Sequence, residues 1–135
     1  MSVDYEKYMV DGELPEMVKH LQKCQQFIEP ALEYDDCHNM QDIADAIAYG
    51  NMQLWPAPKG AMVTQVQDYP RKRVLHVWWA GGELQTILDL IPHIENFAKE
   101  IGCSKITCTG RKGWERVFKH WKNIKPTHFW LSMEV

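Results

Sequence analysis

The segment from Arg73 to Ala80 constrains the fold of this chain more than any other. It has the composition of an extended strand, with apolar residues on both faces: Val74, Leu75, Val77, Trp78 and Trp79. A strand that is apolar on both faces belongs in the middle of a sheet that helices cover on both sides. Because successive side chains of a strand alternate, Trp78 and Trp79 are expected to point to opposite faces.

The rest of the chain supplies the covering helices and the neighbouring strands. Apolar residues at helical spacing predict four helices, at 15–27, 39–50, 84–101 and 114–122, with Pro92 bending or dividing the third. Alternating or β-branched runs predict strands at 52–55, 61–69, 73–80, 105–109 and 129–135. The order is therefore two helices, three strands, a helix, a strand, a helix and a strand.

Composition limits the class of protein. The chain has 135 residues, a net charge of −3 and 45% hydrophobic residues, which suits one soluble globular domain. No apolar run reaches the roughly 20 residues that a membrane helix needs, and the polar, acidic start differs from a secretory signal. Four cysteines without Cys-x-x-Cys spacing indicate reduced thiols in a cytoplasmic protein. Residues 1–13 are expected to form an N-terminal tail, and residues 14–135 a single domain.

Charge is divided unevenly along the chain. Residues 1–58 hold 11 acidic and 3 basic residues, whereas residues 59–135 hold 7 acidic and 12 basic residues. The tryptophans in the basic half have the spacing of core residues, so nucleic acid is not an expected partner. Oppositely charged halves favour contacts with a protein partner or a second copy, which leaves a homo-oligomer open.

Three stretches carry a family resemblance: "VLHVWWAGGEL", "IENFAKEIGCSKITC" and "GRKGWERVFKHW". In this order of elements they resemble the fourth strand and phosphate loop, the central helix and fifth strand, and the next helix of the GNAT family of acyl-CoA-dependent N-acetyltransferases. The resemblance covers about residues 14–135. It implies an α/β (α+β) fold with a GNAT-like mixed, mainly antiparallel sheet and helices on both faces. The pairing of "AGGEL" with "GRKGW" also resembles small GNAT-like proteins of tailed bacteriophages.

The resemblance implies acetyl-CoA as the donor, with its pyrophosphate held by backbone N–H groups at the start of the central helix. The residues matched to this role are Ala80, Gly81, Gly82, Arg111 and Lys112. The family's pattern is Gln/Arg-x-x-Gly-x-Gly/Ala, whereas this chain has Ala80-Gly81-Gly82-Glu83-Leu84. The basic residue is absent, and Glu83 would place a carboxylate beside two phosphates. The alternative is that the glycines only turn the chain from strand to helix.

The family also needs a base for the amine and an acid for the thiolate leaving group. His76 is the best candidate for the base, and its alternative role is that of a partly buried strand histidine. The usual acid, a Tyr on the helix after the fifth strand, is missing because no Tyr follows Tyr69. His120 is the only ready proton donor on that helix. Cys37 and His38 lack a second pair at ligand spacing, so no metal is expected.

Two functions stay open at this point. In the first, the protein transfers an acetyl group from acetyl-CoA to an amine. Four acidic residues around the second helix would attract that amine: Asp35, Asp36, Asp42 and Asp45. In the second, a non-catalytic GNAT-fold protein serves as a bacteriophage virion or assembly component, or as another protein-binding module. Its partners would then be phage structural proteins, in the host cytoplasm or the virion. The degenerate phosphate loop and the missing Tyr leave enzymatic activity itself uncertain.

Overall fold

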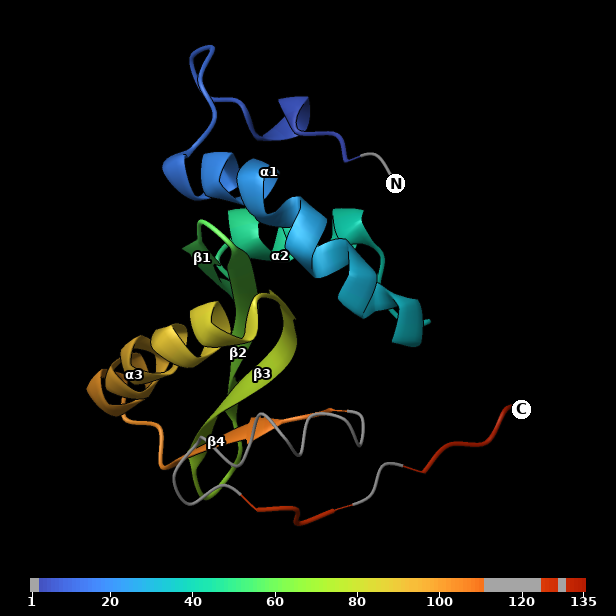
Figure 1. Ribbon diagram of the computed structural model, residues 1–135, viewed down its shortest axis with the longest axis vertical. Helices are drawn as coiled ribbons and strands as arrows, with labels where there is room; N and C mark the ends of the chain where they lie inside the picture. Colours follow the sequence, from blue (N-terminus) through green and yellow to red (C-terminus); the bar gives the residue numbers. More distant parts are fainter. Residues whose placement is uncertain (1–2, 111–124, 129–130) are drawn as a thin grey trace.

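The computed structural model describes residues 3–110, 125–128 and 131–135, apart from the side chain of Tyr34. Its elements follow the expected order as far as β4 (Figure 1). They are η1 (Glu6–Tyr8), α1 (Glu16–Ile28), η2 (Glu29–Tyr34), α2 (Met40–Ala48), β1 (Gln53–Ala57), β2 (Gly60–Asp68), β3 (Arg73–Gly82), α3 (Leu84–Glu100) and β4 (Lys105–Cys108). None of the helices in these ranges is both long and apolar enough to cross a membrane.

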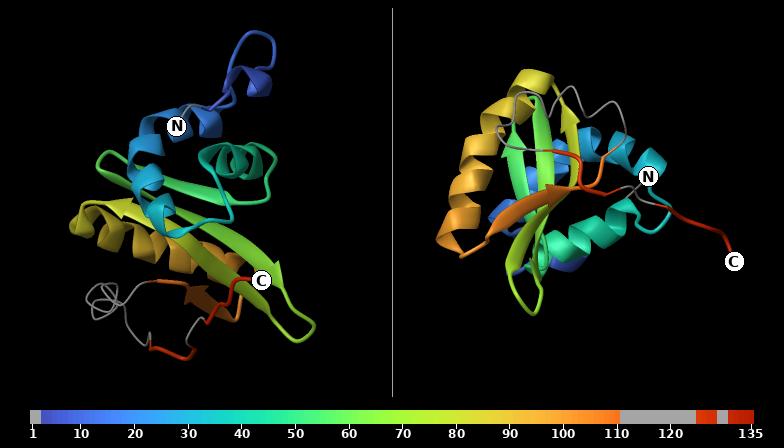
Figure 2. Two further views of the ribbon diagram at one scale, coloured as in Figure 1. Left: turned by 90° about the vertical axis from the view of Figure 1, so that its right-hand side faces the viewer. Right: turned by 90° about the horizontal axis from the view of Figure 1, so that it is seen from below.

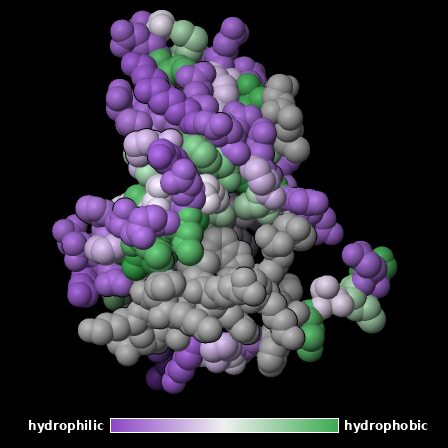
Figure 3. Space-filling view, viewed as in Figure 1, coloured by the Kyte–Doolittle hydropathy of each residue, from purple (hydrophilic) through white to green (hydrophobic). Residues whose placement is uncertain are grey.

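The strands form one sheet in the order β1-β2-β3-β4. The first three strands pair antiparallel, and β4 pairs parallel with β3. Helices α1 and α2 cover one face of the sheet and α3 covers the other, as Figure 2 shows. Mainly hydrophilic residues lie over the N-terminal segment and α1 (Figure 3). The predicted α+β class with a mixed, mainly antiparallel sheet is thereby confirmed.

Two apolar clusters hold these layers together. Beneath α1 and α2, the fully buried Leu21 and Ile43 pack with Val63 of β2 and Trp79 of β3. On the opposite face, residues of α3 such as Ile94 pack against the inward side chains of β2 and β3. The N-terminus of α2 is fixed by a reciprocal capping box between Asn39 and Asp42.

A bulge in β3 overturns the prediction that the two adjacent tryptophans point to opposite faces. Val63 of β2 pairs with Trp79, but the next residue, Thr64, pairs with Val77. Trp78 is therefore an extra residue in β3, which breaks the alternation of side chains. Both indole rings consequently pack on the α1 and α2 side of the sheet.

The structure also bears on the predicted effect of Pro92 and on the predicted C-terminal strand. Helix α3 is not divided, since it runs through Pro92 from Leu84 to Glu100. Residues 131–135 form no strand, because their side chains find nothing to pack against: Leu131 is 89% exposed and Met133 is 83% exposed. The predicted helix at 114–122 lies outside the described residues.

Candidate functional site

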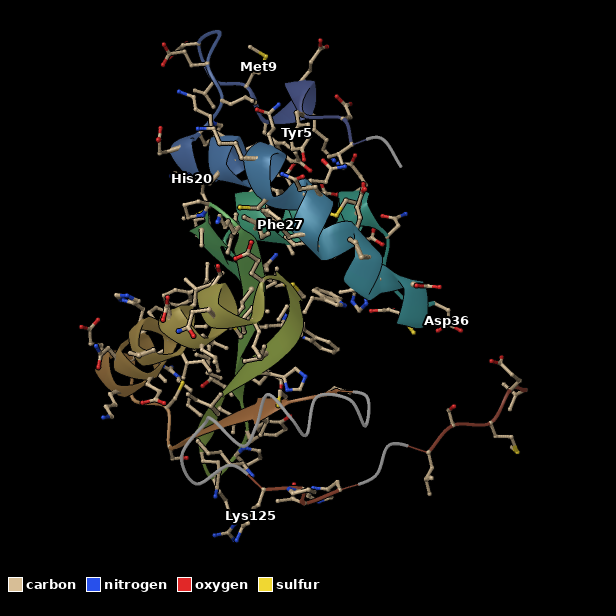
Figure 4. All side chains as sticks on the ribbon, viewed as in Figure 1. Tyr5, Met9, His20, Phe27, Asp36 and Lys125 are labelled. Atoms are coloured by element: carbon tan, nitrogen blue, oxygen red, sulfur yellow. The ribbon has the colours of Figure 1, made fainter. Side chains whose placement is uncertain are left out.

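The predicted phosphate loop lies where β3 ends and α3 begins. A Cβ at Gly81 would meet the backbone oxygen of Phe27 at 1.9 Å, because α1 crosses the sheet there (Figure 4). Gly82 has a φ of +112°, and a Cβ there would lie 2.3 Å from the backbone oxygen of Lys59. The close approach of two neighbouring backbones therefore requires both glycines, whether or not an anion binds beside them.

Lys59 supplies a positive charge at this point, and inspection of the loop sequence missed it. Its carbonyl oxygen accepts a hydrogen bond from the Glu83 N–H at 2.9 Å, and its Nζ lies 3.8 Å from Glu83 Oε1. The lysine comes from the turn between β1 and β2, which antiparallel pairing of β2 with β3 brings beside the end of β3. The predicted hairpin was the signal that could have located it.

The start of α3 presents unused backbone donors beside that lysine. The Glu83 N–H is taken by the Lys59 carbonyl, and the next three residues, 84–86, open the helix. The N–H groups of a first helical turn have no acceptor within the helix, and the helix dipole favours an anion there. An anion at this position would therefore meet N–H groups and the Lys59 ammonium together.

The sheet is open beside the same segment. Pairing of β3 with β4 covers only Val74–Val77 and Lys105–Cys108. Beyond it, β3 continues over residues 78–82 to the start of α3. Among the described residues no strand pairs with this edge, so its backbone groups can meet an extended ligand.

His76 lies in the paired part of β3 and is held on both ring nitrogens. Nδ1 lies 2.8 Å from Thr107 Oγ1, and Nε2 lies 3.2 Å from Thr109 Oγ1. The imidazole is buried, and burial lowers its pKa, which keeps the ring neutral. These contacts fit the structural role considered for His76, while its catalytic role stays a prediction.

A second imidazole lies on the loop that joins η2 to α2. His38 Nδ1 lies 3.0 Å from Asp35 Oδ2, and the ring meets the rings of Trp78 and Trp79 at centroid distances of 5.6 and 5.1 Å. From the sequence, His38 was considered only as a metal ligand. The signal that could have identified it is an acidic residue, Asp35, three residues before a histidine that adjoins the N-cap of a helix.

The acidic residues around α2 divide into two groups. Asp42 belongs to the capping box, and Asp45 binds Lys7 Nζ at 2.8 Å and the Tyr8 hydroxyl. Asp35 and Asp36 follow η2 and lie outside α2, and Figure 4 shows Asp36 at the end of that segment. Asp35 contacts His38, whose ring packs against Trp78 and Trp79. The predicted residues Arg111, Lys112 and His120 lie outside the described residues.

Comparisons with known proteins bear on the fold. No protein-family model matches the chain, and no curated protein matches it significantly. Among solved structures, a probable acetyltransferase matches at a TM-score of 0.65 and 10% identity, covering 89% of this chain and 94% of its own. An acetyltransferase of Trypanosoma brucei matches at 0.59 and 11%, covering 89% and 93%. An aminoglycoside acetyltransferase from an uncultured soil metagenomic sample matches at 0.59 and 12%, covering 87% and 90%. At such identities the likeness concerns the fold alone, and that fold is the GNAT-like fold of acetyltransferases.

Proposed function

We propose that this protein transfers an acetyl group from acetyl-CoA to an amine. One observation carries the proposal: β3 extends beyond its pairing with β4 and leads directly into α3, so that among the described residues a strand edge without a partner lies next to a helix N-terminus. The pantetheine arm of the coenzyme is extended and contains amide groups, which can pair with residues 78–82 as an added strand would. The thioester would then lie where the pairing of β3 with β4 ends.

The pyrophosphate would lie at the start of α3, against the N–H groups of residues 84–86. Ala80, Gly81 and Gly82 let the backbone approach, and Lys59 adds the charge that the loop itself lacks. Glu83 opposes an anion there, but the Lys59 ammonium offsets its charge. Arg111 and Lys112 keep the assisting role that the family resemblance implies, and His76 and His120 keep their predicted roles in proton transfer.

The acceptor is proposed to be a cationic amine. Asp35 and Asp36 give the mouth of the site a negative charge on the side of η2, which attracts ammonium groups. One structure of similar fold is an aminoglycoside acetyltransferase in complex with sisomicin, so polyamines and aminoglycosides are reasonable first acceptors to test.

The alternative is a non-catalytic phage virion or assembly component. Neither the described residues nor the structures named above offer an observation in its favour, and it stays a prediction.

The test of the proposed function is acetyl transfer itself. Purified protein is incubated with acetyl-CoA and a panel of polyamines, aminoglycosides and lysine-containing peptides, and free CoA thiol and product mass are followed. We expect amine-dependent thiol release together with a product heavier by one acetyl group. Thiol release at the amine-free rate with every acceptor, and no acetylated product, would contradict the proposal.

A further inference from the structure

We propose that Asp35 and His38 form a catalytic dyad in which His38 Nε2 takes the proton from the acceptor ammonium. The proposal rests on the proposed function, since it assigns the base for that same acetyl transfer. Its ligand class is a protonated primary amine that approaches from the side of η2. The dyad belongs to the loop between η2 and α2, outside strand β3, which holds His76, the residue predicted as the base.

Asp35 is held firmly enough to orient the imidazole. Its Oδ1 accepts hydrogen bonds from the N–H groups of Cys37 at 2.7 Å and His38 at 3.0 Å, which leaves Oδ2 for His38 Nδ1. Burial alone would raise the pKa of Asp35, but the hydrogen bonds from Cys37 and His38 outweigh it and lower the pKa below its usual value. The carboxylate is therefore charged and directed at Nδ1.

A carboxylate at Nδ1 fixes the tautomer of a neutral imidazole. The proton stays on Nδ1, where it is donated to Asp35, and the lone pair is left on Nε2. Within the described ranges no residue donates to or accepts from His38 Nε2. That nitrogen is the atom of the dyad that can accept a proton.

The tryptophans place this imidazole beside the expected thioester. The His38 ring meets the Trp79 ring nearly edge-on, at 77° between planes, and also contacts Trp78. Trp78 is the first residue of β3 beyond the pairing with β4 and also the bulged residue. Its indole N–H donates to Gln65 Oε1 at 2.9 Å, which fixes the ring. His38 is thus packed next to the point where the pairing of β3 with β4 ends.

His76 is the competing base, and its geometry is less suitable. Both of its ring nitrogens lie within hydrogen-bond distance of threonine hydroxyls, and its side chain is buried. A base needs one nitrogen that can reach the substrate proton. Only His38 keeps such a nitrogen among the two imidazoles that contact Trp78.

The proposed step transfers the acetyl group to the amine and releases one proton in total. His38 Nε2 removes one proton from R–NH3⁺, and the freed nitrogen lone pair attacks the carbonyl carbon of the acetyl thioester. A C–N bond forms, the C–S bond breaks, and the CoA thiolate leaves with the bonding electron pair. The nitrogen loses a second proton, and the thiolate gains one. The products are the acetamide, CoA thiol and one proton, which His38 returns to solvent.

Several ionisable groups surround this imidazole. Asp35, Asp36 and Cys37 lie on its own loop, and His76 of β3 lies beyond the Trp78 ring. Glu134 in the segment 131–135 acts on the Cys37 thiol by its charge. Every ring and hydrogen-bond contact that the described residues make with the His38 side chain comes from its own loop or from β3.

The experiment compares the full-length wild-type protein with His38→Ala, Asp35→Asn and His76→Gln. His93→Gln on the exposed surface of α3 serves as the matched control. Acetyl transfer is measured from about pH 5.5 to about pH 9, a range that brackets the usual histidine pKa, with and without added imidazole. We expect His38→Ala to lower kcat about 100-fold or more with the KM for acetyl-CoA unchanged, and to lose the acidic limb of the profile. Added imidazole should restore part of the rate, which a purely structural loss would not allow.

A second readout does not depend on turnover. Nitrogen-15 NMR of the histidine rings should show neutral His38 as the Nδ1–H tautomer, and Asp35→Asn should abolish that preference. An Nε2–H tautomer in the wild-type protein would overturn the dyad. Acetyl transfer that persists in His38→Ala would show that His38 is not the base, and so would an acidic limb that is lost only in His76→Gln. Either result would leave the proposed function intact. Absence of transfer by the wild-type protein would overturn the proposed function, and the base with it.

Discussion

Trp78 and Trp79 are adjacent in the chain, yet their rings stack at a centroid distance of 5.6 Å with 28° between their planes. Side chains of neighbouring strand residues normally point to opposite faces, and the extra residue in β3 is what brings these two together. The bulge lies immediately beyond Val77, where pairing with β4 ends. The bulge therefore places both rings on the face where His38 packs, next to the point where the pairing of β3 with β4 ends.

Lys59 is predicted to contribute to coenzyme affinity. Lys59→Ala should weaken acetyl-CoA binding about threefold to tenfold, because it removes a charge beside the α3 N-terminus and leaves Glu83 unopposed. Affinity of the variant should also fall less steeply with added salt. Lys72→Ala, in the exposed turn at the opposite end of the β2–β3 pair, is the control that should bind normally. Equal affinities for the two variants would remove Lys59 from the site.

Gly81 is predicted to be required for the fold itself. Gly81→Ala places a methyl group 1.9 Å from the Phe27 oxygen, so α1 must move away from the sheet. The free energy of unfolding should drop by about 3 kcal/mol or more, measured by urea denaturation. At Gly102, where φ is +79° but nothing lies within 4 Å of the added methyl, alanine should cost only about 1 kcal/mol. A loss at Gly81 no larger than that at Gly102 would disprove the close packing.

These glycines show how far the sequence could predict the site. The strand over residues 73–80, the helix that follows and the order of elements through β4 were predictable from periodicity, whereas the structure continues the strand to Gly82. The reason for the glycines was not, because it depends on the backbones of Phe27 and Lys59, which lie far away in sequence. A substitution at Gly82 is consequently a poor test of phosphate binding, since it would disturb the packing in any case.

His76 is predicted to make stability depend on pH. Burial lowers its pKa below the usual value near 6.5, so the unfolded chain takes up a proton before the folded chain does. Its contribution to stability is therefore full above about pH 6.5 and is lost as the pH falls toward the folded-state pKa. His76→Gln should be less stable by about 1–2 kcal/mol at pH 8, and the difference should shrink at pH 5.5. Parallel stability curves for the two proteins would show that the ring titrates normally.

Cys37 is exposed, and its thiol is predicted to react slowly. Its thiol lies 3.5 Å from Asp36 Oδ1, and this hydrogen bond and the nearby charge raise the pKa of the thiol. Less thiolate is then present at pH 8, so disulfide reagents should modify Cys37 severalfold faster in Asp36→Asn. Burial raises the pKa of Cys108 to about 11, and that thiol should react only on unfolding. A Cys37 rate unaffected by Asp36→Asn would contradict this contact.

The residues that sequence reasoning missed share one cause. Lys59 reaches the start of α3 through the register of β2 and β3, and His38 reaches the strand edge because a bulge turns both tryptophans toward it. Neither register nor bulge leaves a periodic trace in a single sequence. The local signals were present in the sequence: a lysine in a tight turn, and an Asp-x-x-His before a helix cap. Only the tertiary structure shows that both lie beside β3.

Acetyl-CoA is proposed to bind at the open edge of β3 and the start of α3, and isothermal titration of the wild-type protein with the coenzyme measures that binding. We expect saturable one-to-one binding at or below millimolar coenzyme, displaced by free CoA and weakened in Lys59→Ala but not in Lys72→Ala. No binding heat at millimolar acetyl-CoA, from protein shown to be folded, would contradict it.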